Sequence, residues 1–86
     1  VYEARLTLAS VYFASSAPEK AQQQYEQALT LQPNGAAALL GLGKVQFSRG
    51  NVKEAQASFE KVVASHAGTP QATEAAAFLA ELKKQN

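Results

Sequence analysis

His66 is the only histidine of the 86-residue chain, and it lies in a short turn segment beside Gly68. A histidine can act as a general base or as a metal ligand, but either role needs further groups around it. The chain has no cysteine, and we find no metal-ligand spacing, carboxylate pair or nucleophile–base arrangement. We therefore expect His66 to serve the end of a helix and not to catalyse a reaction.

A second candidate for chemistry is the segment Gly41-Leu42-Gly43, because glycine-rich loops can cradle phosphates. These glycines fall inside an expected helix, where the absence of a side chain serves close packing. The sequence thus offers no catalytic residue, no cofactor and no metal site. We predict that the chain is not an enzyme.

The charged residues are few and mixed in sign, with a formal net charge of +1. Nucleic-acid-binding modules usually carry a basic stripe that neutralises phosphates, and no such stripe is present. No apolar run approaches the ~20 residues that a membrane-spanning helix requires. We therefore expect neither a nucleic-acid partner nor direct membrane insertion of these residues.

The positioning elements are expected to be helices, because Ala, Leu, Gln and Glu lose little conformational freedom in that state. Apolar spacings of three and four residues, broken by Pro and Gly, predict five helices that end near Ala14, Leu31, Arg49, Ser65 and Lys84. Connections of a few residues imply antiparallel neighbours. The predicted fold is all-α.

Turn residues give the expected boundaries. Ser16 and Glu19 have the spacing of a capping box at the start of the second helix. Asn34 is expected to cap the third helix, and Gly50 to take the left-handed conformation just past its end. The segment 65–70 is expected to be a slightly lengthened connection.

The chain repeats itself when it is shifted by 34 residues. The shift pairs Ala4 with Ala38, Leu6 with Leu40, Leu8 with Leu42, Val11 with Val45, Phe13 with Phe47, Ala21 with Ala55, and Tyr25 with Phe59. A helix pair that repeats at this period is typical of tetratricopeptide (TPR) arrays. The chain resembles that family at Leu8, Ala9, Tyr12, Ala21, Tyr25, Ala28 and Pro33, and again at Leu39, Leu42, Gly43, Gly50, Ala55 and Phe59.

The resemblance implies one domain over residues 1–86, with repeats at 2–35 and 36–69 and a capping helix at 70–85. It also implies that small residues such as Ala9 and Gly43 let the paired helices approach, while an aromatic residue fills the space behind them. Two repeats bury few apolar faces, and Val1 begins in the middle of the pattern. We expect a fragment of a longer protein with upstream repeats, or self-association that covers the first helix.

The family's geometry also implies a concave groove lined by the first helix of each pair. The partner-binding residues expected there are Leu6, Ser10, Phe13, Leu40, Lys44 and Phe47. Leu and Phe occur twice on the same face, which suits an apolar partner segment, although core packing is the slightly favoured explanation. Lys44 is expected either to pair with a carboxylate of the partner or to be solvated. The carboxylate clamp of some TPR co-chaperones is not present, because Leu6 and Ser10 stand at its positions.

The sequence therefore predicts a scaffold that binds a peptide or a partner-protein segment in its groove. The alternative is a structural spacer that stacks on copies of itself, and in that case the protein forms a homo-oligomer. The Ala- and Gln-rich composition is similar to that of bacterial TPR proteins, including proteins of envelope assembly. It indicates a bacterial assembly in the cytoplasm, the periplasm or the cell envelope, with the envelope favoured.

Overall fold

A computed structural model describes residues 1–85, which form five α-helices. Their bounds are α1 Tyr2–Ala14, α2 Pro18–Leu31, α3 Ala36–Ser48, α4 Val52–Ser65 and α5 Pro70–Gln85. No strand occurs within the described residues. The predicted all-α fold of five helices is confirmed, and each predicted end lies within about a residue of the observed one.

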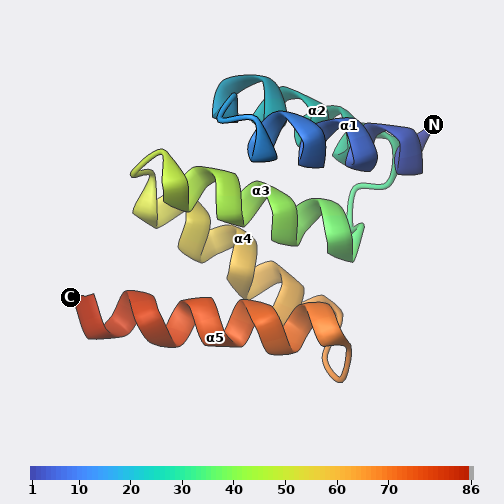
Figure 1. Ribbon diagram of the computed structural model, residues 1–86. Coiled ribbons are helices and arrows are strands. Elements are labelled where there is room, and N and C mark those ends of the chain that lie inside the picture. The colour runs from blue at the N-terminus through green and yellow to red at the C-terminus, as the bar shows by residue number, and fades with distance from the viewer. Residues whose placement is uncertain (86) are drawn as a thin grey trace.

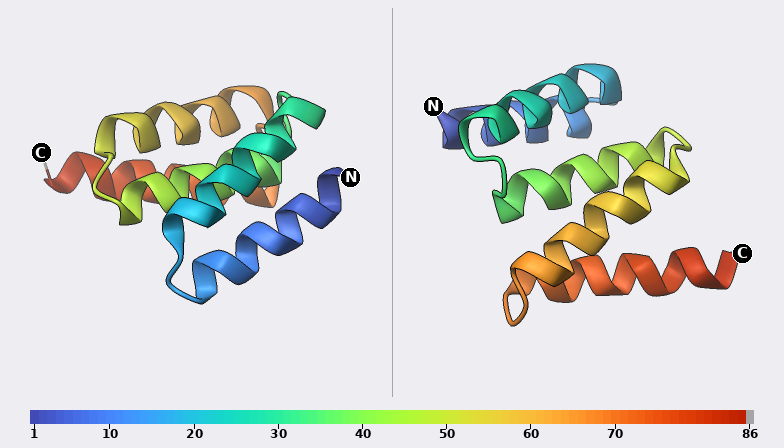
Figure 2. Two further views of the ribbon diagram at one scale, coloured as in Figure 1. Left: turned by 90° about the horizontal axis from the view of Figure 1, so that it is seen from above. Right: turned by 180° about the vertical axis from the view of Figure 1, so that it is seen from behind.

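The helices form a stack, with α1 and α2 at one end and α5 at the other (Figure 1). Successive helices run antiparallel, and α2 packs on α3 as α4 packs on α5. The first helices of the pairs also touch, since α3 contacts both α1 and α5. Among residues 1–85, the backbones of α1 and α2 do not come close to those of α4 and α5, so α3 is their shared neighbour. The same order is visible from above and from behind (Figure 2).

The turns that end α1 and α3 have the same backbone conformation. Ser16 has φ 63° and Gly50 has φ 82°, and the two residues are 34 positions apart. In each turn the next N–H donates to a carbonyl five residues earlier, at 2.8 Å for both Ala17 to Tyr12 and Asn51 to Gln46. This is the Schellman arrangement, in which the left-handed residue is usually glycine.

The expected left-handed Gly50 is therefore confirmed, but the expected capping box is wrong. Ser16 ends α1 and does not cap α2, whose N-cap residue is Ala17 with no side-chain hydrogen bond. The cause is geometric, since a residue with positive φ cannot also take the extended conformation of an N-cap.

We expect Ser16→Gly to raise the free energy of unfolding by about 1 kcal/mol. Left-handed conformation costs an L-residue ~1–2 kcal/mol, and part of this gain is lost because glycine makes the unfolded chain more flexible. Gly50→Ala should lower stability by about the same amount for the same backbone reason. A Cβ at Gly50 would meet nothing within 4 Å, so no steric clash contributes. Urea denaturation of both variants tests the expectation, and equal signs for the two changes would contradict it.

The start of α3 also differs from the expectation. Its N-cap residue is Gly35 and not Asn34, and Gly35 has no side chain that could cap. Instead the N–H of Ala38 donates to the hydroxyl of Tyr2 at 3.3 Å, so α1 supplies the missing acceptor. A side chain at Gly35 would collide with this hydroxyl. Glycine at this position therefore lets Tyr2 come close enough to cap the helix in place of a side chain of residue 35.

The connection between α4 and α5 is not lengthened. It comprises residues 66–69, as many as the residues 32–35 that join α2 to α3. Pro70 is the first residue of α5, where its missing N–H costs nothing. The hydroxyl of Thr69 accepts from the N–H of Ala72 at 3.2 Å and caps this helix.

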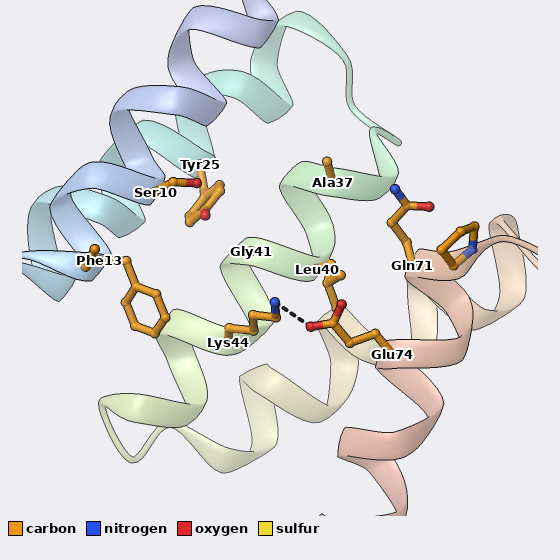
Figure 3. Close-up of a pocket in the computed structure, with 11 residues that line it drawn as sticks. Ser10, Phe13, Tyr25, Ala37, Leu40, Gly41, Lys44, Gln71 and Glu74 are labelled. Atoms are coloured by element: carbon orange, nitrogen blue, oxygen red, sulfur yellow. Dashed lines mark ion pairs between the residues drawn. The ribbon is translucent and has the colours of Figure 1, made fainter.

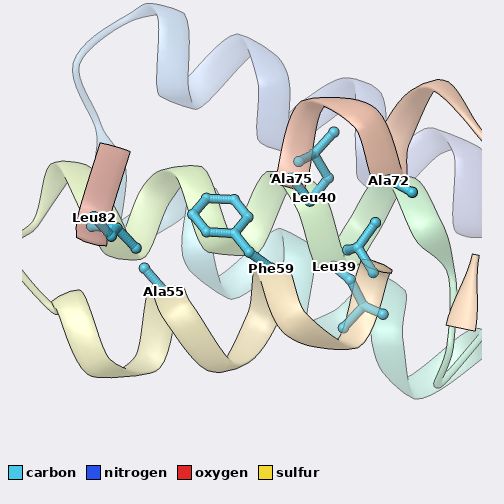
Figure 4. Close-up of a cluster of buried hydrophobic side chains, with 8 residues drawn as sticks. Leu39, Leu40, Ala55, Phe59, Ala72, Ala75 and Leu82 are labelled. Carbon is cyan, nitrogen blue, oxygen red and sulfur yellow. The ribbon is translucent and has the colours of Figure 1, made fainter. Parts of the chain in front are cut away.

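Two apolar clusters hold the stack together. The larger lies between α3, α4 and α5 around Phe59, which is fully buried (Figure 4). The smaller joins α1, α2 and α3 through Ala9, Ala21, Tyr25, Leu42 and Val45. Both include residues of α3, so α3 is buried on two sides.

Each cluster contains one aromatic ring that lies against a glycine. A Cβ added to Gly43 would lie 2.6 Å from the ring of Phe59, and one added to Gly41 would lie 2.3 Å from the ring of Tyr25. Phe59 thus packs on its own helix pair as expected, and Tyr25, which lies in one cluster with Ala9 and Ala21 of its own pair, also packs on the next pair. The residue of α1 that matches Gly43 is Ala9, so α1 has no glycine at that position. Gly41 of α3 leaves the space for the ring of Tyr25.

Two polar side chains between paired helices are satisfied by polar partners. Arg5 donates from Nη1 to Oε1 of Gln24 at 2.9 Å. Gln46 is buried and accepts from the hydroxyl of Ser58 at 2.7 Å. Each pair links the two helices of one hairpin, so the polar groups are satisfied where a hydrophobic contact is usual.

Candidate functional site

The candidate site is a pocket of about 380 Å³ on the side of the stack where α1, α3 and α5 lie next to one another (Figure 3). Three alternate helices, α1, α3 and α5, form its walls, and Tyr25 of α2 reaches it from behind. The lining residues are Ser10, Phe13, Ala14, Tyr25, Ala37, Leu40, Gly41, Lys44, Pro70, Gln71 and Glu74. The pocket is open to solvent and mixes aromatic rings with an ion pair and an amide.

Four of the six residues predicted for the groove line this pocket, namely Ser10, Phe13, Leu40 and Lys44. The other two do not. Leu6 is partly buried against the cluster of α1, α2 and α3. Phe47 packs on α5, where its ring meets Phe78 edge-on with centroids 6.1 Å apart.

The lining residues differ in how much surface they offer. Leu40 is only 7% exposed and belongs to the core around Phe59, so packing is its main role. Phe13 is partly buried, and its ring lies towards α3 at the edge of the pocket (Figure 3). Tyr25 is 7% exposed and forms the back of the pocket beside Gly41. Of these three side chains, Phe13 therefore offers the most apolar surface to a ligand.

In the structure Lys44 pairs with a carboxylate of its own chain. Its ammonium lies 2.5 Å from a carboxylate oxygen of Glu74, so the ion pair links α3 to α5 across the pocket (Figure 3). The two side chains are 33% and 46% exposed, and such exposed pairs contribute ~0–1 kcal/mol to stability. The pair is thus weak enough for a ligand to compete with it.

Gln71 and Glu74 were missed from the sequence, although the signal was present. They stand 34 residues after Ala37 and Leu40, which are groove positions of α3. The sequence prediction does not continue the groove beyond the second repeat, because residues 70–85 are expected to be a capping helix. In the structure α5 lies against α3 as α3 lies against α1, so it continues the same wall.

Outside the pocket, His66 links two loops. It is the C-cap residue of α4, and its Nε2 lies 2.5 Å from the carbonyl oxygen of Asn34 in the connection between α2 and α3. A structural role at a helix end accounts for this contact. In the part of the chain that the structure describes, no three His, Cys, Asp or Glu side chains gather as metal ligands. Nor is any helix there long and apolar enough to cross a bilayer.

Stacked antiparallel helix pairs with a groove along their first helices define an α-helical repeat protein of the solenoid type. The sequence model of the tetratricopeptide repeat matches residues 6–70, and the chain belongs to that family. TPR repeats generally mediate protein–protein interactions and are generally not enzymes. No curated protein matches the chain.

Proposed function

We propose that this chain binds a segment of a partner protein in the groove formed by α1, α3 and α5. The observation that carries the proposal is the pocket at the middle of this groove, which combines aromatic surface with exchangeable polar groups. We place the domain within a bacterial multiprotein assembly, because its composition is similar to that of bacterial TPR proteins. We assign it no catalytic activity.

The lining indicates what the bound segment offers. An apolar side chain of the partner fits against Phe13 and the edge of Tyr25, where it displaces water from aromatic surface. The hydroxyl of Ser10 and the amide of Gln71 lie on opposite walls and suit a peptide backbone between them. Repeats 2–35 and 36–69 together with helix 70–85 supply these walls, so the whole domain is the binding unit.

The proposal is tested with peptides selected from a random library against the unaltered chain. We expect Ser10→Arg to weaken the selected peptides at least tenfold, because a long side chain on exposed Ser10 fills the pocket without changing the core. Phe13→Ala should weaken them by a similar factor, which corresponds to about 1.4 kcal/mol. Affinity is measured by fluorescence anisotropy, and circular dichroism verifies that each variant is folded.

Lys53→Ala is the matched control, since Lys53 is exposed on α4 and does not line the pocket. It should leave the affinity unchanged. Selected peptides that bind equally well to the Ser10→Arg and Phe13→Ala variants would show that recognition lies elsewhere on the domain.

A further inference from the structure

A second pocket lies where the second helices of the two pairs, α2 and α4, meet α3. Its volume is about 400 Å³. It shares no lining residue with the pocket of α1, α3 and α5, so the proposed groove does not use it. Its apolar lining consists of Leu29, Pro33, Leu39, Leu42 and Ala57.

This pocket also contains an amide with an unused donor. Gln46 lines the pocket and is only 8% exposed. Its Oε1 accepts from the hydroxyl of Ser58 at 2.7 Å, which fixes the orientation of the amide but satisfies Oε1 alone. Within residues 1–85 the Nε2 of Gln46 has no acceptor, and no fully buried side-chain atom there lacks a partner. Nε2 is therefore accessible from the pocket.

The amide and the neighbouring hydroxyl present one donor and one acceptor to a ligand. Because Ser58 gives its proton to Gln46, the Ser58 oxygen can still accept a hydrogen bond. A ligand that satisfies both groups needs an acceptor and an N–H on the same edge. The primary carboxamide of Asn and Gln side chains has both. A trans peptide group points its N–H and C=O in opposite directions, and a carboxylate has no donor.

The first helix pair differs at the matching place. The residue of α1 that stands 34 positions before Gln46 is Tyr12. The ammonium of Lys20 lies 5.7 Å from the centroid of the Tyr12 ring, and Lys20 matches the pocket residue Glu54. The ring therefore extends to the level that Glu54 has on the second pair. The shorter side chain of Gln46 leaves space at this level.

We propose that this pocket binds the carboxamide of an Asn or Gln side chain in an extended segment of a partner protein. Glu54 and Lys61 lie at its edge, are exposed, and form no ion pair within residues 1–85. They are seven residues apart on α4, a distance of about 10 Å along the helix. A small amide does not reach both charges, whereas an extended chain does.

The two edge charges restrict the sequence of the bound segment. In an extended chain, residues two positions apart share a face, so residues two positions before and after the amide lie about 13 Å apart on the pocket side. The flexible side chains of Glu54 and Lys61 can reach both positions. The segment therefore carries a basic residue towards Glu54 and an acidic residue towards Lys61. This inference does not depend on peptide binding in the groove.

The test uses disulfide tethering, which raises the local concentration of a weak ligand. The chain has no cysteine and Ala57 is exposed at the pocket, so Ala57→Cys introduces a single anchor. The probes are the peptides Lys-Ala-Gln-Ala-Glu and Glu-Ala-Gln-Ala-Lys, each joined to a thiol by two glycines. Matched probes carry Met or Glu in place of Gln. Mass spectrometry measures how much of each probe remains attached as the concentration of 2-mercaptoethanol rises.

We expect a Gln probe to be retained at least fivefold more strongly than the corresponding Met probe, which has a similar length but no amide. Gln46→Leu in the Ala57→Cys chain should abolish this preference, and circular dichroism verifies that the variant is folded. Gln23→Cys is the matched control, because Gln23 is exposed on α2 and stands 34 residues before Ala57. At that anchor the Gln and Met probes should be retained equally.

Equal retention of the Gln and Met probes at Ala57→Cys would overturn the proposal. So would stronger retention of the Glu probe, because the ligand would then be a carboxylate. Retention of 3-mercaptopropanamide as strong as that of the Gln probes would also overturn it, since the occupant would be a small amide. Ser10→Arg blocks the groove but should leave the preference for Gln unchanged, so this inference and the groove proposal fail separately.

Discussion

Phe59→Ala is expected to lower the free energy of unfolding by about 3–5 kcal/mol, the usual cost of removing a buried aromatic ring. Phe59 is 0% exposed and lies at the centre of the larger cluster. Its ring stacks on Phe78 with centroids 4.8 Å apart and an interplanar angle of 5°. At ~0.05–0.15 kcal/mol per residue, the 86 residues have a total stability of about 4–13 kcal/mol. The change should therefore remove a large part of it.

Urea denaturation followed by circular dichroism measures this loss. Phe13→Ala is the matched control, because it deletes the same group from a partly buried position on α1. We expect its cost to be less than half as large, since less apolar surface returns to water. Similar losses for the two variants would mean that the cluster around Phe59 is not the main source of stability.

Gly43→Ala is expected to destabilise the fold by about 1–3 kcal/mol, the usual range for overpacking. Alanine is better than glycine in a helix by ~1 kcal/mol, so propensity alone gives the opposite sign. The steric effect should win, because the new Cβ would lie 2.6 Å from the ring of Phe59, and that ring is enclosed on all sides. The ring cannot move without disturbing its stack on Phe78.

A double-mutant cycle separates the two effects. In a Phe59→Leu background the close contact is gone, and Gly43→Ala should become neutral or stabilising. Ala9→Gly at the matching position of α1 should cost only the propensity difference of ~1 kcal/mol, with a small loss of contact. If Gly43→Ala has the same effect with Phe59 and with Leu at that position, the proposed steric coupling is absent.

The fold could be predicted from the sequence because its strongest signals are local and repeated. The apolar spacing predicts all five helices, and Pro and Gly residues mark their boundaries. The 34-residue repeat indicates the family. The capping details could not be predicted in the same way. Ser16 has the residue type of an N-cap, but it takes the left-handed conformation at the end of α1, as Gly50 does at the end of α3. At the start of α3, the hydroxyl of Tyr2 in α1 accepts the hydrogen bond that was expected to go to Asn34. Such caps depend on tertiary contacts.

The candidate site was predicted in part for a related reason. Ser10, Phe13, Leu40 and Lys44 do line one pocket, because a helix face follows directly from residue spacing. Phe47 was not, since α5 packs over it and brings Phe78 against its ring. The ion pair of Lys44 with Glu74 was missed for the same reason. Spacing along one helix does not show what a neighbouring helix brings to it.

The position of α3 between the two ends has a consequence for how the domain opens. Because the helix backbones at the two ends do not approach each other within residues 1–85, loss of α5 leaves most of the packing between α1, α2 and α3 intact, and loss of α1 and α2 leaves most of that between α3, α4 and α5. Partial unfolding can therefore begin at either terminus and proceed inwards, as in a one-dimensional array, with α3 protected until last. Every contact also joins segments close in sequence order, which favours rapid folding.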